Sequence, residues 1–322
     1  LLVVHGTFSH GQKLFEDFAI NVPDEQQAPE KNTLLEWMFH KYRAVLGFDH
    51  WTLSRSPEEN AGMLLDRLPT TWKVKGDTAP LELDIICHSR GGLVTRAFIE
   101  LLNPQVKIRR VIFVGVPNAG TSLANPENWG TMADVLVNLV AEDPSGLFGR
   151  LSGLLFYLLA QNVNERVPGL QAMNPTSFKD ESPTPTYRNF LKRLQQPRFL
   201  TPPSHEQPEY YCIASNFAPD QRTYSILSLL RSASDKLVDK FFKHPNDLVV
   251  DTCSMWSFDT EKMLEEKDWT LPIAEDLSDR VLLFNTHRDY PKNIQPEMMA
   301  GVHHVNYFRQ RKVRDFIRKV LE

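Results

Sequence analysis

The sequence contains a buried strand that turns abruptly into an amphipathic helix, with a serine at the turn. The apolar run at 83–87 is followed at once by HSRGG at 88–92, and helical spacing begins directly afterwards. A serine at such a turn stands clear of the sheet, and the small residues behind it let the turn close. The free amides at the start of a helix favour negative charge nearby. This pattern predicts a nucleophile elbow with Ser89 as the reactive residue.

Short apolar runs alternate with helical patterns along the rest of the chain. The runs are bounded by turn residues, as expected of strands that are buried on both faces of a sheet. The alternation favours the α/β class, with a mainly parallel sheet flanked by helices. The predicted strands are residues 1–4, 83–87, 110–116, 210–215 and 280–284, and the predicted helices are residues 33–46, 57–68, 93–102, 225–242 and 309–321.

Residues 118–200 interrupt this alternation. They have several helical stretches, no convincing strand and a polar, proline-containing tail near 181–185. Their middle, 132–160, is rich in leucine and phenylalanine, so we expect it to pack on the domain or to cover an apolar pocket. We interpret the segment as a helical cap or lid inserted into a single domain, 1–322. Apolar residues at helical spacing are more often core than a lipid-binding lid.

Composition and cysteine count exclude several classes of protein. The 322 residues are 42% hydrophobic and 24% charged, which is typical of globular proteins, and the formal charge of -4 offers no basic field for nucleic acid. Three widely spaced cysteines fit neither a disulfide framework nor a zinc site, and they favour a reducing compartment such as the cytoplasm. The longest dense apolar stretch, near 151–160, is shorter than the roughly 20 residues of a transmembrane segment.

The sequence begins within an apparent buried strand. It has neither an initiator methionine nor a signal-peptide pattern before that strand. We therefore expect it to be part of a longer chain, with room for additional domains upstream.

Two further motifs follow other predicted strands. HGT at 5–7 ends the first strand before a polar turn, where backbone amides can point into a cleft. GVPNAGTSLA at 115–124 ends another strand in a loop rich in glycine, proline and asparagine. Together with CHSRGG at 87–92, and in this order, they resemble the motifs of the lipase-type α/β-hydrolases, including bacterial triacylglycerol lipases and the GPI inositol-deacylase-like serine esterases. One departure is Cys87, which stands where that family usually has glycine, and residues 118–200 match nothing specific.

The resemblance implies an α/β-hydrolase fold with Ser89 as nucleophile. It also implies an oxyanion hole formed by the backbone amides of Thr7 and Arg90. An acid and then a histidine should follow later in the chain, in that order. No metal and no organic cofactor are implied by this set of residues.

Candidates for the later two residues occur in pairs. Asp247 lies in a turn that leads into an apolar run, and it is preferred as the acid over its neighbour Asp251. His304 lies before the final predicted helix and is preferred as the base over His303. His88 adjoins the nucleophile, and we interpret it as a residue that packs beside the site.

The implied reaction is cleavage of a carboxylic ester, in a small molecule or a lipid, through an acyl-enzyme intermediate. His304 would take the proton from Ser89 and later return it to the leaving group, while Asp247 fixes the imidazole. Two alternatives stay open from the residues alone. One is an acyltransferase or amidase that uses the same triad, and the other is a non-catalytic module of this fold that binds a partner or ligand.

Overall fold

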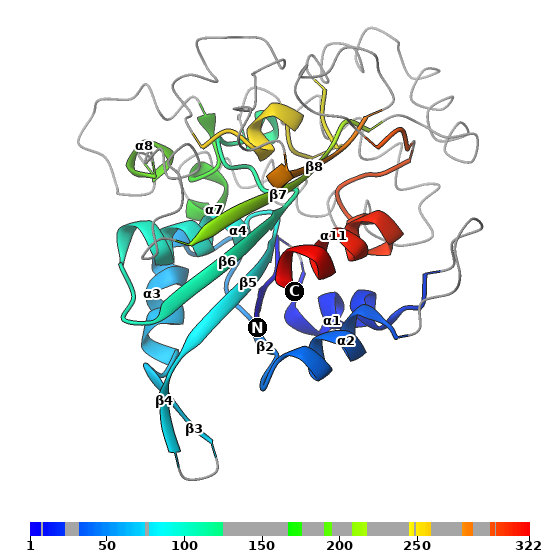
Figure 1. Ribbon diagram of the computed structural model, residues 1–322. Helices are drawn as coiled ribbons and strands as arrows, with labels where there is room; N and C mark the ends of the chain where they lie inside the picture. The colour runs from blue at the N-terminus through cyan, green and yellow to red at the C-terminus, as the bar shows by residue number, and fades with distance from the viewer. Residues whose placement is uncertain are drawn as a thin grey trace, which may run out of the picture.

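A parallel sheet forms the centre of the computed structural model (Figure 1). Within the described residues it has six strands in the order β2-β1-β5-β6-β7-β8, and every neighbouring pair runs parallel. The strands are β1 (Leu2–Val4), β2 (Leu46–Phe48), β5 (Glu82–His88), β6 (Lys107–Val114), β7 (Glu209–Ser215) and β8 (Val281–Phe284). The structure describes residues 1–7, 9–22, 32–74, 77–124, 167–175, 190–194, 208–217, 245–247, 249–258, 279–285, 297–299 and 301–322.

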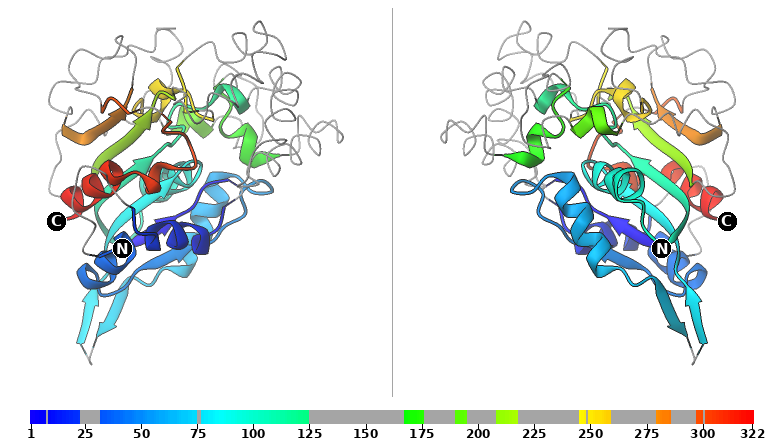
Figure 2. Two further views of the ribbon diagram at one scale, coloured as in Figure 1. Left: turned by 90° about the vertical axis from the view of Figure 1, so that its right-hand side faces the viewer. Right: turned by 90° about the vertical axis from the view of Figure 1, so that its left-hand side faces the viewer.

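Helices cover both faces of this sheet, as the two views of Figure 2 show. One face packs against α1 (Gly11–Ala19), α2 (Leu34–Lys41) and α11 (Arg311–Leu321). The other face packs against α3 (Pro57–Arg67), α4 (Gly91–Arg96) and a π-helical turn, η1 (Ala97–Leu101). Side chains of β1 alternate between the two cores, since Leu2 and Val4 join one and Val3 joins the other. The predicted α/β class is therefore confirmed.

The strands predicted from the apolar runs are confirmed, whereas several smaller elements were missed. The helix predicted at 33–46 ends at Lys41, and its last residue instead begins the edge strand β2. The sequence also gave no indication of α1 or of the antiparallel hairpin β3 (Thr71–Val74) and β4 (Asp77–Pro80). β2 has only three residues and the hairpin is largely polar, so neither carries an apolar run of its own.

The capping boxes at the starts of α2 and α3 explain where those helices begin. The Thr33 and Ser56 hydroxyls accept from the amides of Glu36 and Glu59, and each glutamate accepts from the cap amide in return. Because the four otherwise unpaired amides of a helix start need partners, each box fixes the first helical residue.

Much of the predicted cap lies outside the described residues. Within 118–200 the structure describes 118–124, 167–175 and 190–194, which contain the helical turns η2 (Ser122–Ala124), α7 (Pro168–Gln171) and α8 (Phe190–Arg193). The helix predicted at 225–242 lies outside them as well. Across the described part of the chain, no helix has both the length and the apolar character to cross a bilayer. Cys87 and Cys212 are buried free thiols, and Cys253 is buried as well.

Truncation of Ile86 should test the layered core. Its side chain on β5 is fully buried among residues of β1, β6 and α11. We expect Ile86→Ala to lower the free energy of unfolding by about 2–5 kcal/mol through lost burial and a residual cavity. Phe39→Ala removes a larger side chain that is 60% exposed, and it should change stability by less than about 0.5 kcal/mol in the same urea titration. Equal effects would contradict this assignment of the core.

Candidate active site

Ser89 occupies a strained turn between β5 and α4. Its φ of 54° lies in the left-handed region, which is costly for a residue with a side chain. Two backbone hydrogen bonds hold the turn, from the Ser89 amide to the Val114 carbonyl and from the Gly92 amide to the Ser89 carbonyl, each at 2.9 Å. The side chain is 6% exposed. The sharp turn predicted from the sequence is therefore present in the fold.

Glycines let the segments around Ser89 come into close contact. A Cβ on Gly6 would lie 2.5 Å from the Ser89 Cβ, and a Cβ on Gly91 would lie 2.4 Å from the His5 carbonyl oxygen. No side chain fits at such distances, so glycine is required at both positions. The loop after β1 and the turn after β5, which carry two of the three sequence motifs, consequently lie against each other.

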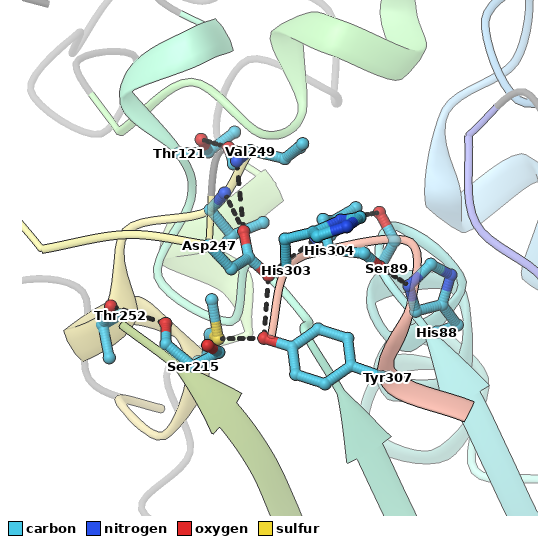
Figure 3. Close-up of polar contacts among 12 residues, drawn as sticks. His88, Ser89, Thr121, Ser215, Asp247, Val249, Thr252, His303, His304 and Tyr307 are labelled. Carbon is cyan, nitrogen blue, oxygen red and sulfur yellow. Dashed lines mark hydrogen bonds and ion pairs between the residues drawn. The ribbon is translucent and has the colours of Figure 1, made fainter. Parts of the chain in front are cut away.

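The structure brings Ser89, His304 and Asp247 together from three distant parts of the chain (Figure 3). The Nε2 of His304 lies 2.8 Å from the Ser89 Oγ, and its Nδ1 lies 2.8 Å from the Asp247 Oδ2. A carboxylate only accepts hydrogen bonds, so Nδ1 carries the proton and Nε2 is left to accept from the serine hydroxyl. All three side chains are buried or nearly so.

Asp247 is fully buried and its carboxylate is saturated with donors. Oδ1 accepts from the amides of Val249 and Val250 at 3.1 and 2.8 Å. Oδ2 accepts from the Tyr307 hydroxyl at 2.9 Å in addition to His304. Buried charge is tolerated when its hydrogen bonds are satisfied in this way. Sequence reasoning missed Tyr307, although its position three residues after His304 was an available signal.

The third sequence motif, 115–124, packs against the segment that carries Asp247. Gly115 has a φ of 55°, and a Cβ there would lie 2.8 Å from the Tyr307 ring and 3.3 Å from the His304 Nδ1. Further along, the Thr121 hydroxyl donates to the Val249 carbonyl at 2.6 Å. The motif thus leaves room for the histidine and fixes the turn that holds the acid.

The two rival residues have other partners. The Asp251 carboxylate accepts from the amide and the hydroxyl of Ser122, at 2.8 and 2.9 Å, and so caps η2. The His303 ring packs edge-on against Phe217, with ring centroids 6.1 Å apart. The structure therefore brings the preferred residue of each pair to Ser89.

His88 contacts the backbone of His304 from the opposite side. Its Nε2 lies 2.8 Å from the His304 carbonyl oxygen, and since a carbonyl only accepts, this nitrogen carries the proton. Burial, and to a lesser extent the neighbouring His304, lower the pKa of His88 to about 3. The ring is accordingly neutral near pH 7 and acts as a fixed donor that holds the histidine loop.

Thr7 and Arg90, the predicted oxyanion donors, adjoin residues of this centre in the sequence. Thr7 directly follows Gly6, and Arg90 directly follows Ser89 at the start of α4. Within the described residues, neither amide takes part in a backbone hydrogen bond of a turn, loop or helix cap. In the same part of the chain, no group of three or more histidine, cysteine or acidic side chains is arranged to hold a metal ion.

Comparison with solved structures identifies the fold as that of the α/β-hydrolases. Lipase 1 from Pelosinus fermentans matches with a TM-score of 0.50, at 11% identity, over 99% of this chain and 96% of that chain. EstA from Clostridium botulinum matches at 0.48, with 13% identity, over 99% and 85%. The mature lipase BlEst2 of Bacillus licheniformis matches at 0.42, with 16% identity, over 80% of each chain. At 11% identity the likeness to lipase 1 concerns the fold alone, and together with the parallel sheet flanked by helices it confirms the predicted α/β-hydrolase fold.

Over residues 1–322 the sequence matches the model of a family described as Domain of unknown function (DUF7379), and the chain belongs to that family. No curated protein sequence matches it significantly. The family description carries no activity, so a function has to be argued from the site itself.

The neutral state of His88 predicts a specific loss of stability in acid. Its pKa is about 3 when folded and about 6.5 when unfolded, so the unfolded state binds more protons between these values. Stability contributed by the neutral ring is therefore present above pH 6.5 and falls by about 1.4 kcal/mol per pH unit below it.

Replacement by glutamine removes the titrating group. We expect His88→Gln to lose about 2 kcal/mol less free energy of unfolding than the wild type between pH 6.5 and pH 5, as measured by urea titration. His40→Gln, at an exposed histidine on α2, is the matched control. Parallel pH dependences of wild type and His88→Gln would contradict a buried neutral histidine.

Gly92 provides a test of the packing behind the turn. A Cβ there would lie 2.4 Å from both methyl carbons of Val116. Gly92→Ala should cost about 1–3 kcal/mol of stability through overpacking. Because Val116→Ala removes those methyls, the double variant should be less destabilised than the sum of the two single variants, in a double-mutant cycle. Additive effects would place the clash elsewhere.

Proposed function

We propose that this chain is a serine hydrolase that cleaves carboxylic esters, with Ser89, His304 and Asp247 as its catalytic triad. The observation that carries the proposal is the buried line of hydrogen bonds from the Ser89 hydroxyl through His304 to Asp247. Serine is a weak nucleophile unless a base stands within hydrogen-bonding distance and a third group orients that base. The contacts of His304 with Ser89 and with Asp247 support both conditions.

In the proposed reaction the Ser89 Oγ attacks the ester carbonyl carbon while His304 Nε2 takes the hydroxyl proton. The tetrahedral intermediate collapses, the bond to the alcohol oxygen breaks, and His304 returns the proton to the leaving alcohol. Water then attacks the acyl-enzyme by the same route, which releases the carboxylic acid and restores Ser89. Asp247 accepts from the His304 Nδ1 throughout and stabilises the imidazolium that forms when Nε2 takes the proton.

Negative charge on the carbonyl oxygen of the intermediate requires its own donors. The amides of Thr7 and Arg90 are the proposed oxyanion hole, since Thr7 follows Gly6, which packs against Ser89, and Arg90 directly follows Ser89. Such amides are worth on the order of 3 kcal/mol each in the transition state. The start of α4 adds the favourable end of a helix dipole.

The proposed substrate is an ester of a small molecule or a lipid. Structures with this fold include proteins named as lipases, and the apolar segment 132–160 supports a cap over an acyl pocket. Water is the proposed acceptor. The competing hypothesis is a binding module whose triad is inactive. It differs from the enzyme in one measurable property, the reactivity of Ser89.

Labelling with a fluorophosphonate probe tests this reactivity. The wild type should be labelled, and Ser89→Ala should not, because such probes react with a serine that a neighbouring base activates. His304→Ala should also lose labelling, whereas His303→Ala should keep it. Hydrolysis of p-nitrophenyl esters, as kcat/KM, should fall at least about 1,000-fold in Ser89→Ala and His304→Ala.

Circular dichroism and the thermal midpoint provide the folding control for each variant. A folded wild type that neither reacts with the probe nor hydrolyses any ester from two to sixteen carbons would refute the proposal and favour the binding module.

A further inference from the structure

The loop that follows β2, residues 49–55, lies at the same edge of the sheet as Ser89. β2 pairs in parallel with β1, and β1 pairs in parallel with β5, so the carboxyl ends of all three strands meet there. This loop belongs to none of the three sequence motifs. It is nevertheless hydrogen-bonded to His5, two residues before Thr7, and to Arg90, which carries the second proposed oxyanion amide.

The first of these contacts runs from the loop to His5. The His50 amide donates to the His5 Nε2 at 3.3 Å, and the His5 Nδ1 lies 2.8 Å from the Gly6 carbonyl oxygen. The amide fixes Nε2 as the acceptor, so Nδ1 carries the proton and donates to Gly6. The two imidazole rings also stack at 4.3 Å. His5 thereby ties the backbone just before Thr7 to the loop.

The second contact runs from the loop to Arg90. The Arg90 Nη2 donates to the Arg55 carbonyl, and its Nε donates to the Gly169 carbonyl at 3.4 Å. The guanidinium is fully buried, and no carboxylate of the described residues forms an ion pair with it. Burial lowers the pKa of Arg90 to about 9. Within the described residues the charge of Glu59 favours this cation, and the two carbonyls are the groups that accept hydrogen bonds from it.

Other hydrogen bonds connect the loop to three neighbouring helices. The Asp49 carboxylate accepts from the Gly11 amide at 2.6 Å, and the buried Asn60 donates to the Trp51 carbonyl at 2.7 Å. The Gly169 amide donates to the Leu53 carbonyl at 3.1 Å. The loop is thus fixed to α1, α3 and α7 by hydrogen bonds that are separate from its contacts with His5 and Arg90.

We propose that residues 49–55 set the spacing of the oxyanion hole, with His5 and Arg90 as the positioning residues that connect the loop to its two amides. The inference rests on the proposed function. Thr7 lies two residues after His5, and the second amide is that of Arg90 itself. The positions of both donors therefore depend on contacts with the same loop. Oxyanion donors must lie about 3 Å from the developing charge, and a displacement of about 1 Å can cost up to 100-fold in rate.

Arg90→Met is the principal test, since methionine keeps much of the length and apolar volume but cannot donate to Arg55 or Gly169. We expect kcat for a p-nitrophenyl ester to fall about tenfold or more, with KM changed less than about threefold. Arg193→Met is the matched control, because Arg193 pairs with Glu58 on the surface of α3 and α8 and contacts neither loop nor Ser89.

A readout specific to the oxyanion hole is the preference for an ester over its thionoester. Sulfur is larger and accepts hydrogen bonds poorly, so well-placed amides favour the oxygen substrate. Misplaced amides should reduce this preference, and we expect the ester to thionoester ratio of kcat/KM to fall at least about threefold in Arg90→Met. A purely structural role would lower both rates equally and leave the ratio unchanged.

A pair of variants at His5 keeps the test decisive if Arg90→Met does not fold. His5→Phe preserves the ring stacking on His50 but removes both hydrogen bonds. His5→Gln can still accept from the His50 amide. We expect His5→Phe to lower kcat and the ester preference, and His5→Gln to recover a substantial part of both.

The outcomes separate this inference from the proposed function. Absence of both probe labelling and ester hydrolysis in the folded wild type would refute the proposed function itself. Normal labelling of Ser89, together with an unchanged ester preference in folded Arg90→Met and His5→Phe, would overturn the positioning role alone.

Discussion

The left-handed backbone of Ser89 is the constraint around which the remaining structure is arranged. A side chain at a φ of 54° costs on the order of 1–3 kcal/mol, and only a surrounding fold can hold it. Two hydrogen bonds stabilise this conformation: the Ser89 amide donates to the Val114 carbonyl of the sheet, and the Gly92 amide donates to the Ser89 carbonyl. The same geometry pushes β1 and α4 into contact, which explains why both approaching segments require glycine.

The ends of the central strands also hold the histidine loop in register with this serine. His88 at the end of β5 donates to the His304 carbonyl, and Ser215 at the end of β7 donates to the Val302 carbonyl at 2.6 Å. Ser215 accepts in turn from Thr252, in the segment that carries Asp247. The ends of the strands therefore help to align the histidine with the acid (Figure 3).

The sequence predicted those parts of the site whose signals are local. Ser89 was evident because a strand, a sharp turn and a helix occupy consecutive residues, and the strands were evident because both of their faces are buried. The expected order of acid and histidine along the chain reduced the candidates to Asp247 or Asp251 for the acid and to His303 or His304 for the histidine. Arg90 as a buried donor and the His5–His50 stack were not predictable, because each contact joins segments that are far apart in the sequence. The edge strand β2 was missed because three residues carry too little periodicity to compete with the helix before them.

The proposed nucleophile, Ser89, and its proposed base, His304, are separated by 215 residues along the chain. During synthesis a ribosome therefore exposes the Ser89 turn long before the histidine exists to activate it. Bringing such remote residues together carries a loop-closure cost that must be met by packing of the intervening strands. The proposed activity would consequently be absent from the nascent polypeptide until the segment that carries His304 docks on the sheet, so that it would arise late in folding.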